Sequence, residues 1–411
     1  MTTATASASA IFTLTKTTLL TGLTRAAGAI SSKTTLPVLH NVLLTADESG
    51  TLRLVGTDLD VTVATLVDAA ITGDHKGVTI PAKKLAEFVK ECAEGPITLT
   101  VEGDAKSRLK AGAARMKLTG IPADKFPNVT ERSAQAIDLF TLPAGTLAAL
   151  AKPVAPCVSQ EESRPILNGV LFEIGKATGS GDEAKRTVRM VATNGHRLGV
   201  SETTLIGDQA GASNGEAVDL ILMPKVLALA ASVYASDEAV TVAATPDKNA
   251  IVIKGATTTL TARLIEGPYP NYRQVLPDDF SVVVESDRAA IAQSVKRVNV
   301  IASDQTHRIA LRVTSGADEA RVTVSATTPD MGEAEDWTPV RIAEGAVEGK
   351  EGFRIGFNAA YLLDLLKLTP SDAVRLSLKA PERAARIEPA YGDEKPSVTS
   401  FHVLMPLRLM D

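Results

Sequence analysis

The chain has 411 residues, a formal net charge of −5, 45% hydrophobic residues and only 4% aromatic ones. This length predicts about three domains, with cores built from aliphatic side chains. Two cysteines, Cys92 and Cys157, exclude a disulfide scaffold and fit a reducing cytosol, and no apolar run approaches the roughly 18 residues of a membrane helix. The acidic balance argues against non-specific DNA binding unless the lysines and arginines gather on one surface.

The first third of the chain combines helical and strand patterns. Met1 to Ala10 has neither, and we expect a short disordered lead-in rather than a secretory signal. A first helix is expected from the spacing of Leu19, Leu23, Ala26 and Ile30. Strand-like runs follow at 38–44, 52–57, 61–67 and 78–81. A second helix carries Leu85, Phe88, Val89 and Cys92 on one face, and strand-like runs at 97–101 and 108–118 close the unit.

The same order returns in the middle third. Leu147, Leu150, Ala151 and Val154 mark a helix, which Pro153 and Pro156 should end early. A strand at 166–174 precedes a turn at Thr193. A second helix carries Leu227, Ala230, Ala231 and Tyr234, before strands at 240–244, 250–254 and 258–264.

The last third repeats the order once more. Its first helix has Ile291, Val295, Val298 and Ile301 on one face; its second has Leu362, Leu365 and Leu366, with Asn358 as N-cap. Strands are expected at 309–313, 321–326, 353–357, 374–378, 384–388 and 401–409. Thr57, Thr193 and Thr328 occupy equivalent turns, 136 and 135 residues apart. The sequence therefore predicts three α+β units with two helices each and largely antiparallel sheet.

The motifs of enzyme chemistry are absent from the sequence. It lacks a Gly-x-Ser-x-Gly elbow, a phosphate-binding loop and a His-Glu-x-x-His pair, and its five histidines are scattered. Asp58 and Asp60 are the one carboxylate pair that suggests Mg²⁺, as in a nuclease. A solvated turn is the favoured interpretation, because no other acidic cluster completes a metal site.

Basic residues recur on the polar sides of the predicted helices, while acidic ones concentrate in expected loops such as 333–336. One helix of this kind is an ordinary solvated face, but the recurrence in three units favours a shared positive surface. The basic residues are Arg25, Lys33, Lys83, Lys84, Lys90, Lys152, Lys225, Lys296, Arg297 and Lys367.

The stretch from Val191 to Val200 has two possible interpretations. Asn194-Gly195 supplies the positive φ angles of a tight hairpin, with His196 and Arg197 just past the tip. Alternatively, Thr193, Gly195, His196 and Arg197 form one wall of a site. The equivalent turns at Thr57 and Thr328 lack a following Gly-His-Arg, which favours a binding role for the middle copy.

Several stretches together resemble the bacterial sliding clamp family, the beta subunits of replicative DNA polymerase. They are Leu36-Pro37-Val38-Leu39, Gly56-Thr57-Asp58-Leu59, 123–128, 167–173, 192–198, 269–273, 356–362 and 405–409. The resemblance implies three clamp domains (1–132, 133–279 and 280–411) and a head-to-tail homodimer closed into a ring. It also implies a processivity factor without catalytic chemistry, cofactor or metal. Such a ring encircles double-stranded DNA, independently of sequence, in the cytoplasm at the nucleoid.

The resemblance also assigns two contact surfaces. The dimer interface would contain Arg108, Arg115, Met116 and Leu118 facing Val300, Ile301, Glu333 and Glu335. A pocket for short linear motifs of the polymerase, the clamp loader and repair proteins would contain Leu167, Thr193, Gly195, His196, Arg197, Leu198, Pro270, Arg273, Val275, Asn358, Tyr361, Val403, Met405, Pro406, Leu407 and Arg408.

Three departures from the family pattern affect the expected specificity of this pocket. Gln274 stands where a second arginine is frequent, Pro165 stands where an aromatic residue is common, and Met410-Asp411 extend the usual end. A specialised paralogue, such as an inhibitor-resistant clamp, therefore remains an alternative to the housekeeping protein. A metal-dependent nuclease is the second alternative.

Overall fold

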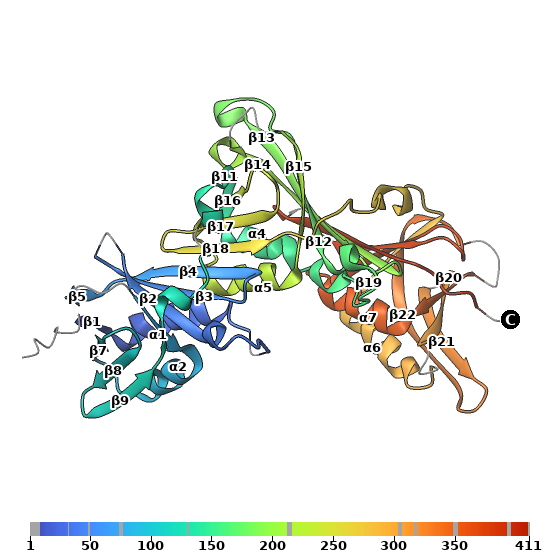
Figure 1. Cartoon of the computed structure of the whole chain (residues 1–411). Helices are drawn as coiled ribbons and strands as arrows, with labels where there is room; N and C mark the ends of the chain where they lie inside the picture. Colours follow the sequence, from blue (N-terminus) through green and yellow to red (C-terminus); the bar gives the residue numbers. More distant parts are fainter. Residues whose placement is uncertain are drawn as a thin grey trace, which may run out of the picture.

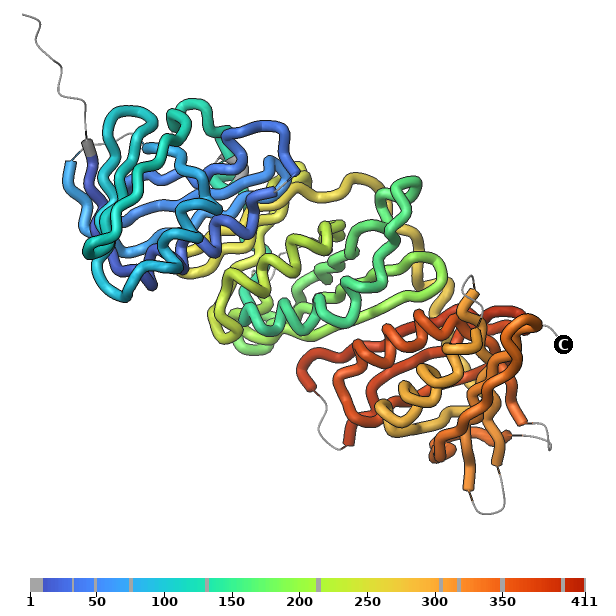
Figure 2. The backbone as a smooth tube through the Cα atoms, turned by 90° about the horizontal axis from the view of Figure 1, so that it is seen from below, coloured from blue at the N-terminus to red at the C-terminus, as the bar shows by residue number. Residues whose placement is uncertain are grey.

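The computed structural model describes residues 9–31, 33–47, 50–73, 77–129, 131–211, 216–302, 306–315, 319–347, 352–392 and 396–409. It contains three α+β units in a row, each with a pair of long helices packed against antiparallel strands. In Figure 1 the units follow one another from blue through green to red, and Figure 2 shows the helices of all three facing the viewer on one side. The predicted fold class is confirmed.

The elements of each unit follow a common order. The first unit contains β1 (Ser9–Thr15), α1 (Lys16–Ala27), β2 (Asn41–Ala46), β3 (Leu52–Thr57), β4 (Val61–Val67), β5 (Ala70–Thr72), β6 (Val78–Pro81), α2 (Ala82–Glu91), β7 (Pro96–Glu102), β8 (Lys106–Ala111), β9 (Ala114–Thr119) and β10 (Ile121–Pro122). A short helix, α3 (Glu131–Ala134), leads to the second unit.

The second unit contains β11 (Ile137–Pro143), α4 (Ala144–Ala151), β12 (Val170–Ile174), β13 (Lys185–Thr193), β14 (Arg197–Ile206), β15 (Val218–Leu222), α5 (Pro224–Val233), β16 (Ala239–Ala244), β17 (Ala250–Lys254) and β18 (Thr258–Arg263). The third unit contains β19 (Val282–Asp287), α6 (Arg288–Asn299), β20 (Arg308–Ser315), β21 (Ala320–Thr328), β22 (Gly332–Gly345), β23 (Phe353–Asn358), α7 (Ala359–Leu368), β24 (Ala373–Leu378), β25 (Ala385–Ala390) and β26 (Thr399–Leu404). None of the helices in these described ranges is long and apolar enough to cross a membrane.

Side-chain caps fix where the helices begin, and buried apolar stripes fix which face of each helix packs against the core. The first helix of the third unit is capped by Asp287, whose carboxylate accepts from the N–H of Ala290, and the second by Asn358, which accepts from Tyr361 as predicted. α1 buries Leu19 and Leu23 at helical spacing. α4 stops at Ala151, before Pro153, because proline cannot continue the helical hydrogen-bond ladder.

Two predicted strands begin with a turn of 3-10 helix instead. The runs at 38–44 and 166–174 open with η1 (Pro37–His40) and η4 (Pro165–Asn168), and only their second halves join a sheet. In both, proline supplies the φ angle of a helical turn and lacks the N–H that a strand ladder needs. The predicted run 108–118 is a hairpin of two strands, whose turn contains Gly112 at a φ of +58°.

Two other expectations were wrong. The acidic run 333–336 lies inside β22 rather than in a loop, because its alternating charged side chains point to the open face of a half-buried strand. Ser9 and Ala10 belong to β1, and Ala10 is buried. The rest of the predicted lead-in, residues 1–8, lies outside the described residues, as do Met410 and Asp411.

Strands cross the boundaries between units, and we call each such strand pair a seam. Thr57, Thr193 and Thr328 end β3, β13 and β21, and each is followed by the returning strand of a hairpin, β4, β14 or β22. The first seam pairs β4 with β18, and the second pairs β14 with β26, both antiparallel. Residues 332–340 of β22 and the whole of β9 have a partner on one edge only within the described chain.

Candidate functional site

The turn after Thr193 is held by its own side chains. Gly195 has a φ of +88°, which a residue with a side chain could adopt at this position only with strain. The Thr193 hydroxyl donates to the carbonyl of Arg197 at 2.8 Å and accepts from the N–H of Gly195. The side-chain oxygen of Asn194 accepts from the N–H groups of His196 and Arg197, each at 3.0 Å. The predicted hairpin is confirmed, but Gly195 alone has a positive φ; Asn194 contributes through its side-chain hydrogen bonds instead.

This tip packs against helix α7 of the next unit. The His196 ring stacks on Tyr361 with 5.9 Å between centroids and 19° between planes, and the Arg197 guanidinium lies 4.9 Å from the centre of the same ring. Arg197 is only 8% exposed and donates to Asp364 at 2.7 Å and to the carbonyl of Pro156 at 2.8 Å. His196 is therefore available to a ligand, while Arg197 mainly fixes the tip against α7.

The end of the chain forms the opposite side of the site. Beyond β26, the N–H of Met405 donates to the carbonyl of His196 at 2.9 Å, and Leu407 donates to Gly356 at 2.8 Å. Met405 keeps 41% of its surface exposed. A cavity of about 560 Å³ opens here, lined by Arg354, Gly356, Pro381, Glu382, Pro406, Leu407, Arg408 and Leu409.

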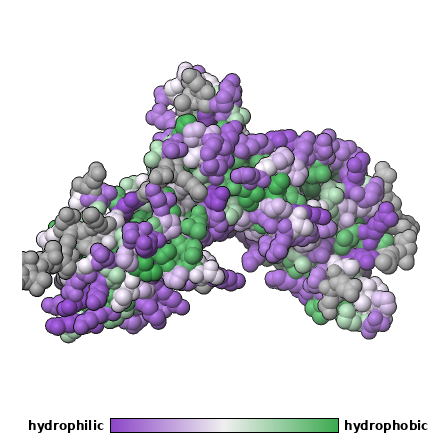
Figure 3. Space-filling model, viewed as in Figure 1, coloured by the Kyte–Doolittle hydropathy of each residue, from purple (hydrophilic) through white to green (hydrophobic). Residues whose placement is uncertain are grey.

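A small apolar cluster, separate from the main core, lies under this surface. It consists of Leu171, Val191, Leu198, Val200, Ile221, Tyr272 and Val403. Val275 beside it is 48% exposed. Figure 3 shows hydrophobic side chains at the surface where the second unit meets the third. The surface can accept a short segment with apolar side chains, because it is preformed and partly uncovered.

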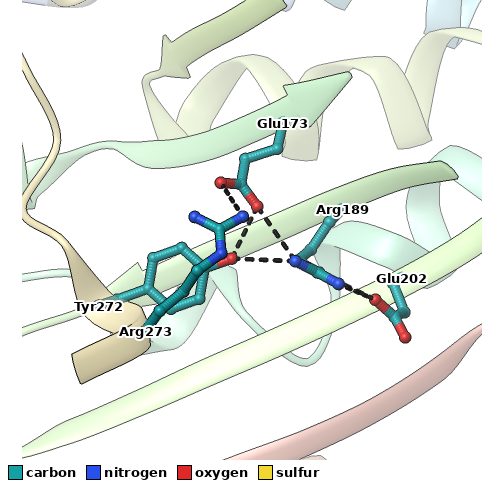
Figure 4. A network of polar contacts seen from close by, with 5 residues as sticks. All are labelled: Glu173, Arg189, Glu202, Tyr272 and Arg273. Atoms are coloured by element: carbon teal, nitrogen blue, oxygen red, sulfur yellow. Dashed lines mark hydrogen bonds and ion pairs between the residues drawn. The ribbon is translucent and has the colours of Figure 1, made fainter. Parts of the chain in front are cut away.

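A charged network beside the cluster fixes the segment 269–275 (Figure 4). Glu173 accepts from the Tyr272 hydroxyl at 2.7 Å and from Arg273 at 2.8 Å, and Arg189 bridges Glu173 and Glu202. Burial raises the pKa of Tyr272 to about 12, and the hydrogen bond with Glu173 acts in the same direction. Arg273 is thus paired with Glu173, and the predicted pocket residue Pro270 lies exposed on the same segment.

The floor behind the tip contains groups that sequence reasoning did not single out. His402 on β26 is fully buried, and its Nε2 donates to the carbonyl of Pro153 at 2.9 Å, across the second seam. Burial lowers the pKa of His402 to about 4. Burial also raises the pKa of the Cys157 thiol to about 12, so this thiol is not a nucleophile. No local pattern marks these residues, because they come from distant parts of the chain.

The structure brings most of the predicted pocket residues together where the second and third units meet. The tip residues Thr193, Gly195, His196, Arg197 and Leu198 meet α7 with Asn358 and Tyr361, and the chain end with Val403, Met405, Pro406, Leu407 and Arg408. Leu167 lies half-buried on η4. Asn358 and Val403 act structurally, since Asn358 caps α7 and Val403 is 1% exposed.

The predicted basic residues lie on or beside the long helices. Lys83, Lys84 and Lys90 are exposed on α2, and Lys296, Arg297 and Lys367 on α6 and α7. Lys33 and Lys152 are exposed just after α1 and α4. Four of these cations have internal partners: Arg25 donates to Thr257 and Thr258, Lys84 pairs with Glu87, Lys225 pairs with Asp58, and Arg297 pairs with Asp336.

The carboxylate pair of the nuclease alternative has a structural role. One oxygen of Asp58 accepts from the N–H groups of Asp60 and Val61, and the other pairs with Lys225 at 3.0 Å across the first seam. Within the described ranges, no group of three or more His, Cys, Asp and Glu residues could hold a metal ion.

Three repeated units with their helices on one face, strand-paired seams and an apolar pocket at the second seam define a clamp-type protein. The comparisons agree, because the chain matches the N-terminal domain of the DNA polymerase III beta subunit at residues 10–130, the central domain at 141–271 and the C-terminal domain at 273–408. The chain belongs to the DNA polymerase III beta subunit family, the beta sliding clamps.

Individual relatives match over nearly the full length. The Beta sliding clamp of Pseudomonas aeruginosa is 30% identical over 402 residues, covering 97% of this chain and 100% of the relative. That of Escherichia coli K12 is 28% identical over 401 residues, covering 97% and 100%. A crystal structure of the P. aeruginosa clamp bound to griselimycin superposes with a TM-score of 0.82 at 29% identity, covering 97% and 100%. The function is that of a DNA sliding clamp and processivity factor, and the comparisons favour neither a nuclease nor a specialised paralogue.

Proposed function

We propose that two copies of this chain close head to tail into a ring around double-stranded DNA. The single observation that supports this most is the unfilled third seam. Each internal seam joins the strand after an equivalent threonine turn to the last long strand of a neighbouring unit. The equivalent strands that remain are β22, which follows the threonine turn of the third unit, and β9, the last long strand of the first unit. Each has a free edge in the described chain. A second copy supplies the missing partner for both.

The side chains beside these edges suit such an interface. Met116 and Leu118 on β9 pack against the core of the first unit and remain half-exposed. Val300, at the end of α6, is 75% exposed, and Ile301 follows it. Arg108 and Arg115 carry positive charge on one side, and Glu333 and Glu335 carry negative charge on the other. An apolar centre with opposite charges at its rim is typical of a stable contact between subunits.

The helices line the hole of the proposed ring and carry the basic residues toward DNA. Lys83, Lys90, Lys152, Lys296 and Lys367 are exposed and have no ion pair within the described chain. Lysine side chains are long and flexible, so they can neutralise phosphates without fixing the register. Such contacts are sequence-independent and permit sliding.

The pocket at the second seam is the proposed docking site for short linear motifs of polymerase, clamp-loader and repair proteins. The rigid tip with His196, the exposed Met405 and the cavity beside Leu407 provide apolar contact, and Arg408 suits an acidic residue of the ligand. We further propose clamp domains at 1–132, 133–279 and 280–411, work in the cytoplasm at the nucleoid, and no catalytic step by this chain.

Retention on DNA tests the ring directly. The protein is loaded onto nicked circular plasmid and separated by gel filtration, and the plasmid is then linearised with a restriction enzyme. A ring held topologically stays on the circle and leaves the linear molecule from its ends. Equal retention on circular and linear DNA contradicts encirclement. A monomer at micromolar concentration in light scattering contradicts the dimer.

A further inference from the structure

The only tryptophan of the chain, Trp337, lies at the free edge of β22 and is 50% exposed. Half of a large apolar ring system thus remains uncovered at a strand edge. Tryptophan is also among the residues most enriched at interface hot spots, the positions where truncation to alanine weakens binding most. The position of Trp337 on β22 determines what it can contact.

Trp337 points away from the helices. Its neighbours on β22 face helix α6, since Asp336 pairs with Arg297 and the Thr338 hydroxyl bonds Ser294. Successive side chains of a strand alternate between faces, so Trp337 shares the opposite face with Glu333 and Glu335. The Arg321 guanidinium, from the neighbouring strand β21, lies 5.8 Å from the centre of the indole ring.

The free edge of the first unit has a matching face. On β9, Met116 and Leu118 pack toward the core, so Arg115 and Lys117 point to the other side, where both are exposed. This face of β9 is basic, whereas on the free part of β22 the same face carries Glu333, Glu335, Trp337 and Pro339, so its charges are negative. The charges are therefore complementary across the proposed contact.

The two internal seams indicate how these edges would meet. In both seams the strands pair antiparallel, and residues from the same face of the sheet meet across the seam. Leu260 lies opposite Val63 in the main core, and Val403 lies opposite Leu198 in the smaller cluster. A third seam built in this way places the outward residues of β22 beside those of β9. The outward residues of β9 include Arg115, and long side chains reach both the opposite and the diagonal position across a strand pair.

We propose that Trp337 anchors the contact between two copies of this chain, with its ring held between Arg321 of its own copy and Arg115 of the second copy. The proposal deepens the ring described above and rests on it. Guanidinium groups on an indole face are favourable contacts, more so once water is excluded. Replacing Trp337 therefore weakens the dimer without disturbing the unit that carries it.

The intrinsic fluorescence of Trp337 reports on this contact without any label. Acrylamide quenching is measured on the wild-type dimer and on the Leu118→Glu variant, whose buried charge blocks the interface and supplies the monomer reference. Sedimentation gives the oligomeric state of the same samples. We expect Trp337 to be protected from acrylamide in the dimer, with blue-shifted emission, and accessible in the monomer.

Three variants test the contact energetically. Trp337→Ala and Arg115→Met are each expected to raise the dimer dissociation constant by roughly tenfold or more, and Trp337→Phe by less, since an aromatic face remains. Ile206→Ala, another exposed apolar position, is the control. The inference is overturned if acrylamide quenches Trp337 equally in the dimer and in the monomer, or if Trp337→Ala leaves the dimer dissociation constant unchanged. Either result leaves the ring intact. A wild-type protein that stays monomeric overturns the ring itself.

Discussion

The backbone N–H of Met405 donates to the carbonyl oxygen of His196, 2.9 Å away, and joins the end of the chain to the tip of its central hairpin. This bond continues the pairing of β26 with β14, in which Leu198 lies opposite Val403. The two sides of the pocket are therefore connected through backbone rather than through mobile side chains. The pocket is formed before any ligand arrives, which lowers the entropic cost of binding.

Removing residues 405–411 should abolish binding of a partner peptide while leaving the dimer intact. The deletion takes away the exposed Met405 and one lining of the cavity but ends beyond β26, so the second seam keeps its strand pair. Fluorescence anisotropy of a labelled peptide with an apolar linear motif measures the loss. Met405→Leu, which keeps apolar bulk, serves as the control. Unchanged affinity after the deletion would show that the peptide binds elsewhere.

Replacing Arg197 should destabilise the protein as well as the pocket. Arg197→Ala leaves the carbonyl of Pro156 and the carboxylate of Asp364 without their donor and removes the contact with Tyr361. Hydrogen bonds to charged groups suggest a loss of about 2 kcal/mol in the free energy of unfolding. Urea denaturation followed by circular dichroism measures it. Asp364→Asn keeps an acceptor for Arg197 and should cost less; an equal or larger effect would contradict this assignment.

Mild acid should weaken the second seam through His402. Burial lowers the pKa of His402 to about 4, whereas an unfolded histidine titrates near 6.5, so the unfolded chain binds the extra proton between these values. The contribution of His402 is complete above about pH 6.5 and is lost as the pH falls toward 4, by about 1.4 kcal/mol at pH 5.5 relative to pH 7.5.

Comparing urea unfolding at pH 7.5 and 5.5 tests this assignment. His402→Gln can still donate to Pro153 but cannot take up a proton, so its stability should change less between the two pH values. His40→Asn, at an exposed histidine, should keep the wild-type pH dependence. An identical pH dependence for His402→Gln and the wild type would exclude His402 as the titrating group.

The helical face should account for the salt dependence of DNA binding. The double variant Lys83→Ala/Lys90→Ala removes two exposed cations of α2. The slope of log affinity against log salt concentration should fall by about 1 for each lysine that neutralises a phosphate. Anisotropy of a labelled duplex over a salt series measures the slope. Lys176→Ala/Lys185→Ala, at exposed sites on the sheet side, should leave it unchanged, and the opposite ranking would relocate the DNA-binding surface.

The repeat and its helices could be predicted from the sequence because their signals are local. Helical spacing, the Asn358 cap and the Pro153 stop each act over a few residues, and the structure confirms them. Asn194-Gly195 likewise defines its turn through its own hydrogen bonds. The apolar runs after Pro37 and Pro165 misled the strand predictions, because such runs do not distinguish a 3-10 turn from the start of a strand.

The parts of the site that sequence could not predict depend on contacts between distant strands. Arg197 was expected on a pocket wall, but it is buried because Asp364, 167 residues away, pairs with it. Glu173, Arg189 and Glu202 lie on three adjacent strands, and each alone resembles an ordinary exposed charge. β22 was misread for the same reason, since acidic residues on a strand's open face resemble a loop until the pairing with β21 is known.

The pairing of β26 with β14 joins segments that lie far apart in the sequence. Arg197–Glu202 pair with Thr399–Leu404, so the second seam closes a loop that contains most of two units. Contacts between such distant segments carry a high loop-closure entropy and slow the folding of a chain. We therefore expect the second seam, and the pocket with it, to form late in folding, after the helices and hairpins of each unit.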